Sequence, residues 1–344
     1  MSNRKRVLVT GSSRGIGRAI AIRLAKDGYE VIVHCAGNTE KAEETKRIIE
    51  ENGGKAEVIK ANLCDTAETV LLAEKMGDID ALVLNASLQY RNHWEEIPLS
   101  EVYEQLNCNF VSSLMLIQAA VPNMKKKGWG RIVTVGSVQE AKPHPDMLIY
   151  SASKAAQTNM VRSLSLQLAP FGITVNNMAP GVIYTDRNVE ALSDPEYAKK
   201  VTASIPVGFY GTPDDCAGTV SLLCSDEGRY ITGQSIYVDG GKKCAMKIRF
   251  LGQSGYILKS GNTEIVIDPY LSDSVNRVAN RPRTLPTPIN PEDIRCDAII
   301  CTHNHLDHLD PDTVERINEN QFYITTNEGK DELLKLNRTN VKAL

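Results

Sequence analysis

The sequence predicts an α/β protein built on a doubly wound parallel sheet, followed by a second, smaller domain. Over the first 240 residues, short apolar runs rich in β-branched residues alternate with amphipathic segments of helix length. A glycine-rich turn directly follows the first of these runs, and the character of the sequence changes near residue 242. Because strand–helix alternation implies parallel strands joined by crossover helices, the first part is expected to carry helices on both faces of one sheet.

The expected elements of this first part follow the apolar runs. The strands are predicted at Val7–Thr10, Val31–His34, Val58–Ala61, Ala81–Asn85, Arg131–Gly136, Ile173–Met178 and Ser235–Val238. The helices are predicted at Gly15–Asp27, Thr39–Glu51, Ser100–Lys127 and Tyr150–Pro170. Open sheets of this kind bind ligands outside the carboxyl ends of their strands, so functional residues are expected there.

A domain boundary is predicted at residues 242–246, which divides the chain into domains 1–243 and 246–344. From Met246 onward, short runs separated by glycine-containing turns, including Tyr256–Lys259 and Thr263–Asp268, predict an antiparallel meander. Residues 276–293 are rich in Pro, Arg and Asn and are expected to form a loop. A further buried strand is predicted at Asp297–Thr302, running into a group of histidines.

Composition excludes several classes of function. The 344 residues are 42% hydrophobic and 24% charged, as in globular proteins, and the net charge of -3 argues against nucleic acid or an anionic membrane as the partner. No apolar run approaches the roughly 20 residues of a membrane helix, and the N-terminus has no signal-peptide pattern, so a cytoplasmic protein is expected. The eight cysteines show no paired spacing and are expected to be free thiols.

The segment Thr10–Gly17 has the composition of a phosphate-binding turn. It follows a strand and opens a helix, where glycines allow close approach of backbone to phosphate and the helix N-terminus favours negative charge. The end of the second strand, His34–Asn38, holds no carboxylate to bind a ribose 2′-hydroxyl. Arg14 is expected to pair with a 2′-phosphate, although it could equally be a solvated loop residue. The sequence therefore favours NADP, with NAD as the alternative.

Tyr150 and Lys154 are the candidate proton-transfer pair. Their spacing of four places both side chains on one face of a helix. A free tyrosine has a pKa of about 10, and a neighbouring ammonium lowers it by favouring the phenolate. Ser137 follows a predicted strand and could hydrogen-bond a substrate oxygen.

These motifs together resemble the short-chain dehydrogenase/reductase family. The order TGSSRGIG at 10–17, Asn85-Ala86-Ser87, Asn109, Ser137, YSASK at 150–154 and PGVIYT at 180–185 is that of the family, and the similarity extends over residues 1–241. It is most similar to the 3-oxoacyl-carrier-protein reductase and sugar or polyol dehydrogenase branches. The resemblance implies a Rossmann fold, hydride transfer between a nicotinamide and a secondary alcohol or ketone, and a homotetramer or dimer.

The resemblance also implies roles for individual residues. Tyr150 would act as acid/base, Ser137 would orient the substrate, Lys154 would hold the nicotinamide ribose, and Asn109 would anchor a water of a proton relay. The cofactor would contact Gly11, Ser13, Arg14, Gly15, Ile16, Gly17, Asn62, Leu63, Asn85, Ala86, Tyr150, Lys154, Pro180, Gly181, Ile183 and Thr185. Two positions depart from the pattern: Ser87 replaces a glycine, and Asn62 stands where the family often has an aspartate.

The substrate is weakly encoded. The segments Gln139–Ile149 and Asn188–Ser204 are expected to border the pocket. The polar side chains there favour a sugar-like or hydroxy-acid substrate over a long acyl chain, although a solvated rim explains them equally well. They are Gln139, Glu140, His144 and Asp146.

Three of the six histidines lie between residues 303 and 308. Closely spaced histidines and a carboxylate can converge on a divalent metal such as Zn or Mn. The HxHxDH pattern and the run 251–274 resemble the metallo-β-lactamase superfamily, in particular its ascorbate-6-phosphate-lactonase-like branch. This resemblance implies a partial αββα domain in which His303 and His305 serve one metal, and Asp307 and His308 another.

No histidine follows His308, whereas that family completes its sites with later ligands. Truncation, completion by a partner and a vestigial remnant are all open, with truncation favoured, and no hydrolase turnover is expected. The leading hypothesis for the whole chain is thus a dehydrogenase/reductase acting on a small molecule. A bifunctional sugar dehydrogenase and lactonase, and a non-catalytic nucleotide sensor, are the alternatives.

Overall fold

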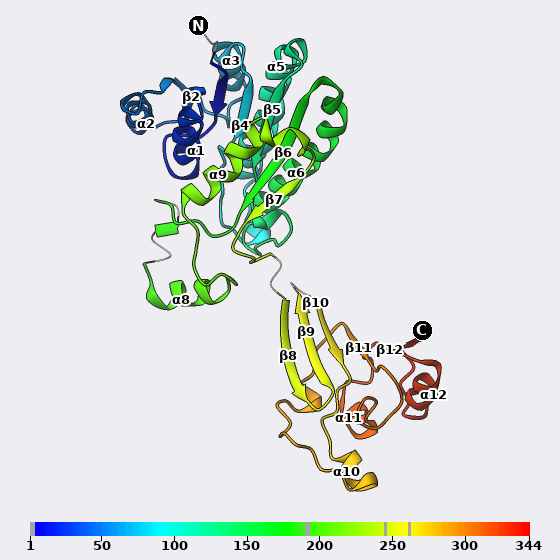
Figure 1. Cartoon of the computed structure of the whole chain (residues 1–344). Helices are drawn as coiled ribbons and strands as arrows, with labels where there is room; N and C mark the ends of the chain where they lie inside the picture. Colours follow the sequence, from blue (N-terminus) through cyan, green and yellow to red (C-terminus); the bar gives the residue numbers. More distant parts are fainter. Residues whose placement is uncertain (1–3, 187, 190–192, 244–245, 261–262) are drawn as a thin grey trace. The chain divides into compact units, whose positions relative to one another are not determined.

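The computed structural model describes residues 4–186, 188–189, 193–243, 246–260 and 263–344. It divides into two compact units, Met1–Lys243 and Cys244–Leu344 (Figure 1). Each unit has its own sheet and its own buried apolar core, and each is described separately below. Among the described residues, no helix is both long and apolar enough to cross a membrane.

The described residues of the first unit form a seven-stranded sheet in the order β3-β2-β1-β4-β5-β6-β7, with every neighbouring pair parallel. The order reverses direction after β1, as in a doubly wound sheet, so this predicted fold is confirmed. The strands are β1 (Arg6–Val9), β2 (Glu30–Cys35), β3 (Lys55–Lys60), β4 (Ala81–Leu84), β5 (Gly130–Val135), β6 (Ile173–Pro180) and β7 (Ser235–Val238).

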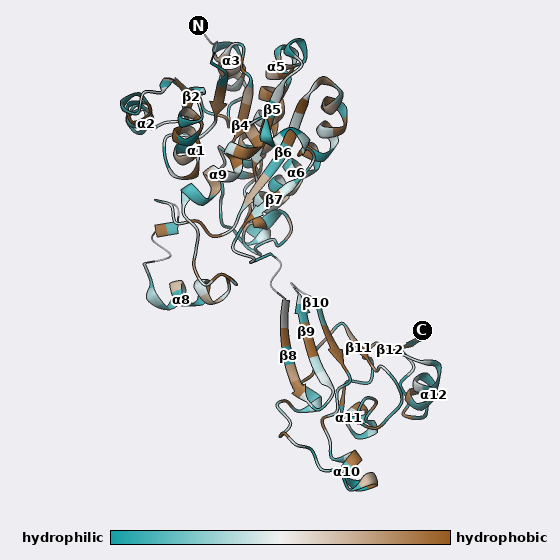
Figure 2. Ribbon diagram, in the orientation of Figure 1, coloured by the Kyte–Doolittle hydropathy of each residue, from teal (hydrophilic) through white to brown (hydrophobic). Residues whose placement is uncertain are grey.

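Two apolar cores lie on opposite faces of this sheet, because successive strand residues point to opposite sides. Val7 and Val9 belong to one core and Leu8 to the other, and all three are fully buried. The central strands are correspondingly hydrophobic (Figure 2). The first core is completed by α1 (Gly15–Lys26), α2 (Thr39–Glu51) and α9 (Pro213–Cys224), and the second by α3 (Thr66–Met76), α5 (Ser112–Lys127) and α6 (Leu148–Leu168).

The helix predicted at Ser100–Lys127 differs in detail. It consists of α4 (Leu99–Leu106), a π-helical turn at Asn107–Val111 and α5. A π turn inserts an extra residue into the helical register and is frequent at functional sites. Here it contains Asn109, a candidate site residue. Further helical pieces whose bounds lie within the described residues are α8 (Pro195–Ala203) and short 3-10 turns at Trp94–Glu96, Val138–Glu140, Ala169–Phe171 and Glu227–Tyr230.

The described residues of the second unit form a six-stranded sheet in the order β13-β12-β11-β10-β9-β8. β8, β9 and β10 pair antiparallel, as the predicted meander requires. The pairs β10–β11, β11–β12 and β12–β13 are parallel. The strands are β8 (Met246–Gly252), β9 (Gly255–Ser260), β10 (Thr263–Ile267), β11 (Ala298–Ile300), β12 (Tyr323–Thr325) and β13 (Val341–Ala343). The helices are α10 (Ser274–Ala279), α11 (Pro311–Arg316) and α12 (Asn327–Lys335), with a 3-10 turn at Pro291–Asp293. Residues 276–279, predicted as loop, are therefore helical.

One face of this sheet packs on the core, and the first hairpin leaves apolar side chains exposed on the other. Phe250 lies opposite Tyr256 in the antiparallel register, with ring centroids 5.2 Å apart. Both are exposed, as is Ile248, whereas Leu251 and Ile257 point into the core.

Candidate active site

A cavity of about 1150 Å³ lies at the carboxyl ends of the strands of the first unit. Residues that follow β1, β2, β4, β5 and β6 all line it, as expected for an open parallel sheet. Among the candidate residues, the lining includes Gly11, Ser13, Arg14, Gly15, Ile16, Gly17, Asn62, Leu63, Asn85, Ala86, Ser137, Tyr150, Pro180, Gly181, Ile183 and Thr185. Lys154 and Asn109 are fully buried and support this wall from behind.

Close packing explains the glycines of the first turn. Gly11 has a φ of 65°, a left-handed conformation that favours glycine, and a Cβ there would lie 2.9 Å from the Cα of Ala86. A Cβ on Gly17 would lie 2.3 Å from the carbonyl oxygen of Gly11 and 2.5 Å from Nδ2 of Asn85. The absence of these side chains lets α1 begin directly against the turn, where its N-terminus faces the cavity.

His34, at the end of β2, holds this turn from behind. Its Nδ1 accepts a hydrogen bond from the backbone N–H of Gly11 at 3.0 Å, and its Nε2 lies 2.9 Å from the carbonyl oxygen of Ala61. Burial lowers the pKa of His34 to about 4, so the ring is neutral near pH 7. The ring therefore carries its proton on Nε2 and bridges the turn to the segment after β3. Its buried position could not be read from the sequence pattern.

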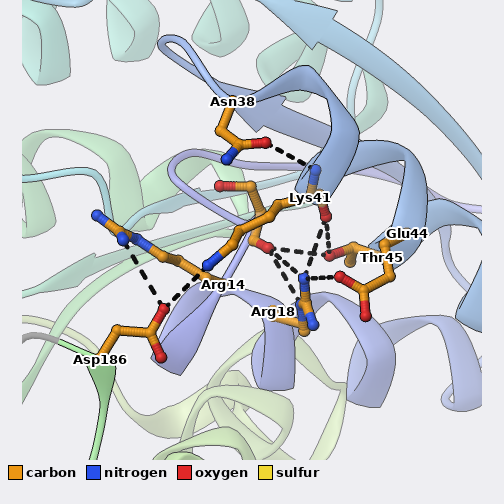
Figure 3. Close-up of polar contacts among 8 residues, drawn as sticks. Arg14, Arg18, Asn38, Lys41, Glu44, Thr45 and Asp186 are labelled. Atoms are coloured by element: carbon orange, nitrogen blue, oxygen red, sulfur yellow. Dashed lines mark hydrogen bonds and ion pairs between the residues drawn. The ribbon is translucent and has the colours of Figure 1, made fainter. Parts of the chain in front are cut away.

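Two cations and one carboxylate border the cavity between the glycine-rich turn and α2 (Figure 3). The carboxylate of Asp186 lies 3.7 Å from the guanidinium of Arg14 and 3.3 Å from Nζ of Lys41. Arg18 donates to the carbonyl oxygens of Ser13 and Lys41, which ties the turn to the start of α2. The sequence analysis identified Arg14 but missed Lys41, because nothing local connects α2 with the turn.

Tyr150 and Lys154 lie one turn apart on α6, both buried. The Lys154 ammonium is 5.7 Å from the centroid of the Tyr150 ring. It donates to the carbonyl oxygen of Val135 at 2.8 Å and to Oε1 of Gln157 at 3.0 Å. Lys154 is thus held in place with its charge directed at the tyrosine.

Asn109 is fixed by the loop that follows β4. Its Oδ1 accepts from the backbone N–H of Leu88 at 2.8 Å, and its Nδ2 donates to the Leu88 carbonyl oxygen at 2.9 Å and to Ser153 Oγ at 3.0 Å. These bonds use both sides of the amide and join the π turn to the cavity wall and to α6.

Glu140 differs from expectation. Its carboxylate does not line the cavity but turns toward side chains of β6 and β7. One oxygen accepts from Asn177 Nδ2 at 2.9 Å, and the other accepts from the hydroxyls of Ser235 at 2.5 Å and Tyr237 at 2.9 Å. The turn Val138–Glu140, which begins directly after Ser137, is therefore attached to two strands. The prediction that Glu140 makes the pocket polar is wrong, because donors on β6 and β7 hold the carboxylate away from the cavity.

The rest of the expected rim is divided. Gln139 and His144 line the cavity, whereas Asp146 does not. From the segment Asn188–Ser204, the lining includes Asn188, Tyr197 and Val201. Residues 190–192 of that segment lie outside the described residues.

Both departures from the family pattern lie at the cavity. Ser87 is among the lining residues, on the segment after β4. Asn62 also lines it, and its Oδ1 accepts from the backbone N–H of Cys64 at 3.1 Å. Asn62 therefore stabilises the turn after β3 with its side-chain oxygen.

In the second unit, the histidines of residues 303–308 gather around Asp268. The Asp268 carboxylate accepts from the backbone N–H and the hydroxyl of Thr302 at 2.7 and 2.8 Å, and lies 2.8 Å from Nδ1 of His308. Nε2 of His303 lies 3.1 Å from Nδ1 of His305. Asp268 was not identified from the sequence, because it follows β10, more than thirty residues before the motif.

The donor chemistry of this group suits a divalent ion, but the arrangement does not gather it into a site. Asp307 contributes its carboxylate only at 3.5 Å from Nε2 of His308. Within the part of the chain that the structure describes, no three His, Cys, Asp or Glu side chains are grouped so that they could hold a metal ion. The described residues therefore do not fit the metal that the motif implies.

Comparison with known families gives the first unit an assignment. Residues 5–196 match the short chain dehydrogenase family. The chain is a short-chain dehydrogenase. It is an oxidoreductase that uses a nicotinamide cofactor and acts on a secondary alcohol or ketone, as the motifs predicted.

The relatives include both predicted branches of this dehydrogenase family. A 3-oxoacyl-[acyl-carrier-protein] reductase of Staphylococcus aureus is 38% identical over 245 residues, which cover 70% of this chain and 99% of the relative. An L-rhamnose 1-dehydrogenase (NAD(P)(+)) of Azotobacter vinelandii is 36% identical, covering 69% of this chain and 96% of the relative.

The solved structures include both branches as well. A putative gluconate 5-dehydrogenase of Beutenbergia cavernae with bound NADP has a TM-score of 0.67 and 34% identity, covering 70% of this chain and 97% of its own. A 3-oxoacyl (acyl-carrier-protein) reductase of Agrobacterium tumefaciens with NADP bound has a TM-score of 0.66 and 32% identity, and the match covers 69% of this chain and 93% of that structure's chain.

The second unit of this dehydrogenase has a separate match. Residues 247–344 match a domain of the beta-lactamase superfamily, as the motif predicted. The chain therefore joins parts of two families, and the dehydrogenase part carries the cavity described above.

Proposed function

We propose that this dehydrogenase transfers hydride with NADP(H), with Tyr150 as the proton donor and acceptor. The observation that carries the proposal is the arrangement at one wall of the cavity: Tyr150 and Ser137 both line it, while the ammonium of Lys154 is held behind the tyrosine. The nicotinamide, when bound, supplies or accepts the hydride.

The residues of this wall divide the work of ketone reduction. The Ser137 hydroxyl donates to the substrate oxygen and fixes its position. The Tyr150 hydroxyl gives its proton to that oxygen as negative charge develops there. Lys154 stabilises the resulting phenolate by its charge, and Asn109 positions the loop at Leu88 and anchors the water through which the proton is replaced. Alcohol oxidation follows the same steps in reverse.

The preference for NADP rests on Arg14 and Lys41, which border the cavity. The segment His34–Asn38 at the end of β2 carries no carboxylate, and the nearby Asp186 pairs with both cations. A 2′-phosphate offers oxygens for charge-assisted hydrogen bonds from both cations. Relatives with bound NADP support this choice. The remaining cofactor contacts are proposed for the lining residues that the motifs identify, with Lys154 contacting the nicotinamide ribose.

The substrate is proposed to be a small molecule of 3-oxoacyl or sugar/polyol type, since both branches occur among the relatives. We also propose that the protein is cytoplasmic and forms a homotetramer or dimer. Sedimentation of the purified protein would test the oligomeric state.

The decisive experiment follows absorbance at 340 nm with NADPH and then NADH, against a panel of β-ketoacyl, keto-sugar and diketone substrates. Tyr150→Phe is expected to lower kcat by about three orders of magnitude, because general acid catalysis contributes roughly 10²–10⁴-fold. Tyr103→Phe, an exposed tyrosine outside the cavity lining, is the matched control and should leave kcat within about twofold.

Equal turnover by wild type and Tyr150→Phe would exclude the proposed role of the tyrosine. Tight NADPH binding without turnover of any substrate would favour the nucleotide-sensing alternative. The bifunctional alternative is supported only by the superfamily match of residues 247–344, since the described histidines do not form a metal-binding group.

A further inference from the structure

The described lining of the cavity is strongly cationic, although the chain as a whole carries a net charge of -3. Besides Arg14 and Lys41, four basic side chains line it: Arg91, Lys142, Lys242 and Lys243. Asp186 is the single Asp or Glu among the described lining residues, and it pairs with Arg14 and Lys41. Of the two carboxylates expected at the substrate rim, Glu140 turns inward and Asp146 lies outside the lining.

These cations differ from those at the nucleotide end in having no acidic partner. Asp186 pairs with both Arg14 and Lys41. In contrast, no Asp or Glu of the described residues lies within ion-pair distance of Lys142 or Lys242. The cavity that Tyr150 lines thus also presents lysines that have no ion-pair partner among the described residues.

Lys142 and Lys242 carry like charges and line the same cavity. Lys242 is partly buried, and burial, followed by the charge of Lys142, lowers its pKa below the ordinary value. Asp239, whose carboxylate accepts from the backbone N–H groups of Gly241 at 2.9 Å and Lys243 at 2.6 Å, acts on this pKa in the opposite direction. Its effect is smaller than those of burial and Lys142, so the pKa of Lys242 stays lowered.

Lys142 and Lys242 lie on two separate segments, and a backbone hydrogen bond of each lysine holds it to its own turn. Lys142 follows the turn attached to β6 and β7 by Glu140, and its backbone N–H donates to the Val138 carbonyl oxygen at 2.9 Å. Lys242 follows β7, and its backbone N–H donates to the carbonyl oxygen of Asp239 at 3.2 Å. The backbone therefore places each lysine at the cavity, and an anion between them would relieve their repulsion.

We propose that the substrate carries an anionic group, a carboxylate or a phosphate, which is bound between Lys142 and Lys242 while its carbonyl or hydroxyl faces Tyr150. This proposal rests on the proposed oxidoreductase function and specifies its substrate class. In the reduction, hydride from the nicotinamide forms the new C–H bond, Tyr150 supplies the proton to oxygen, and the anionic group takes no part in bond changes. Lys142 and Lys242 are thus specificity residues for the hydride-transfer reaction.

The test compares anionic and neutral ketones of matched shape in NADPH oxidation. 5-Keto-D-gluconate is compared with L-sorbose, in which a hydroxymethyl group replaces the carboxylate, and dihydroxyacetone phosphate with dihydroxyacetone. Wild type is expected to prefer the anion in at least one pair by tenfold or more in kcat/KM, and the favoured pair identifies carboxylate or phosphate. The preference should weaken with rising ionic strength.

Lys142→Gln and Lys242→Gln should each lower kcat/KM for the favoured anion about tenfold, with the change mainly in KM, and leave its neutral partner within about twofold. Lys142→Arg, which keeps the charge, should restore most of the preference. Lys75→Gln removes an exposed charge on α3, outside the cavity lining, and should change neither substrate.

Failure of this inference is distinguishable from failure of the proposed function. If neutral ketones are reduced by a Tyr150-dependent reaction while the lysine variants leave both pairs unchanged, the anion site is excluded and the reductase stands. If wild type reduces the neutral member of both pairs better, the anion site is also excluded. If the wild-type protein oxidises NADPH with none of the ketones tested, both the proposed function and the anion site are overturned.

Discussion

Each of the two units carries a recognisable motif, but the hydrogen-bond partners of the motif's polar side chains differ between the units. In the first unit, Lys154 and Asn109 are hydrogen-bonded from behind by backbone carbonyls and neighbouring side chains, while Tyr150 and Ser137 remain at the cavity. In the second, His303 and His305 are hydrogen-bonded to each other. A motif makes a site only where other residues satisfy its supporting groups and leave the reactive ones facing a cavity.

The supporting residues of the first unit come from distant parts of the sequence. Glu140 attaches the turn after Ser137 to β6 and β7, and His34 attaches the glycine-rich turn to the segment after β3. Asp268 is the counterpart in the second unit, but it binds Thr302 and His308 without completing a group of metal ligands. Substitutions that remove these supporting side chains one at a time test how far each unit depends on them.

The largest effect is expected from Glu140→Ala. The substitution removes the acceptor that Asn177, Ser235 and Tyr237 share, and an unsatisfied polar group costs roughly 1–3 kcal/mol when fully buried. Because Ser235 and Tyr237 are only partly buried, we expect a loss of about 3 kcal/mol in the free energy of unfolding and a lower kcat through displacement of Ser137. Both tryptophans, Trp94 and Trp129, lie in the first unit, so urea unfolding followed by their fluorescence reports that unit alone.

Glu140→Gln, which keeps the shape and one acceptor, should lose less stability than Glu140→Ala. Glu74→Ala, an exposed position on α3, serves as the surface control. Unfolding of Glu140→Ala within about 0.5 kcal/mol of wild type would show that the carboxylate does not support the turn.

The second effect concerns pH. The folded pKa of His34 is about 4, against 6.5 for the free side chain. The unfolded chain takes up a proton as pH falls through about 6.5, while the folded ring stays neutral until about 4, so the stabilisation present above pH 6.5 is lost as pH falls toward 4. Between about pH 7 and pH 5 this linkage amounts to about 2 kcal/mol.

His34→Gln cannot titrate in this range and provides the comparison for the pH effect. Tryptophan-monitored urea unfolding should show that wild type loses about 2 kcal/mol more than His34→Gln over the same pH interval. Parallel pH dependences of the two proteins would mean that His34 is not neutral and buried in the folded state.

The third effect separates the two cofactors. Arg14→Gln should raise the Kd of NADPH about tenfold, because a charge-assisted contact with the 2′-phosphate is lost, and leave the Kd of NADH nearly unchanged. Asp186→Asn should act in the opposite direction, lowering the Kd of NADPH by about threefold, since its carboxylate competes for Arg14 and Lys41.

Fluorescence titration with each nucleotide measures both of these changes. Arg23→Gln on the outer part of α1 is the charge control, because its partner is Asp27 rather than the cofactor region. Equal weakening of NADPH and NADH by Arg14→Gln would argue that the arginine positions the turn instead of recognising the phosphate.

The smallest effect on reduction is expected from Asp268→Asn, in the second unit. It removes the charged acceptor of Thr302 and His308, so amide hydrogen exchange should increase over residues 298–309. NADPH oxidation should stay within about twofold of wild type, because the cavity is lined entirely by residues of the first unit. A larger change in turnover would show that the second unit influences the dehydrogenase.

The sheet of the first unit was predictable because its information is local. Val7–Thr10 and Val31–His34 are short runs dominated by β-branched residues, and the turn from Gly11 to Gly17 follows directly from glycine spacing. Helix continuity was predicted less well: the apolar periodicity through Ser100–Lys127 does not reveal the π turn at Asn107–Val111. That turn depends on Asn109 binding the backbone of Leu88, a contact between separate segments.

The candidate site was predictable in part for the same reason. Sequence motifs indicate the chemical roles of Tyr150, Lys154 and Ser137. No motif indicates the roles of Lys41, Glu140 and His34. Glu140 in particular is a polar residue in a loop next to a catalytic serine, which indicates a pocket rim. Only the three donors from β6 and β7 turn it inward.

The sequence by itself therefore determined the order of strands and helices, the family of the first unit and the residue types available for hydride and proton transfer. The tertiary structure decided which side chains face the cavity, which support it from behind, and which cations are neutralised. The physical reason is that residue type and spacing are properties of a short segment. Burial, hydrogen-bond partners and charge compensation instead depend on segments that meet only after the chain has folded.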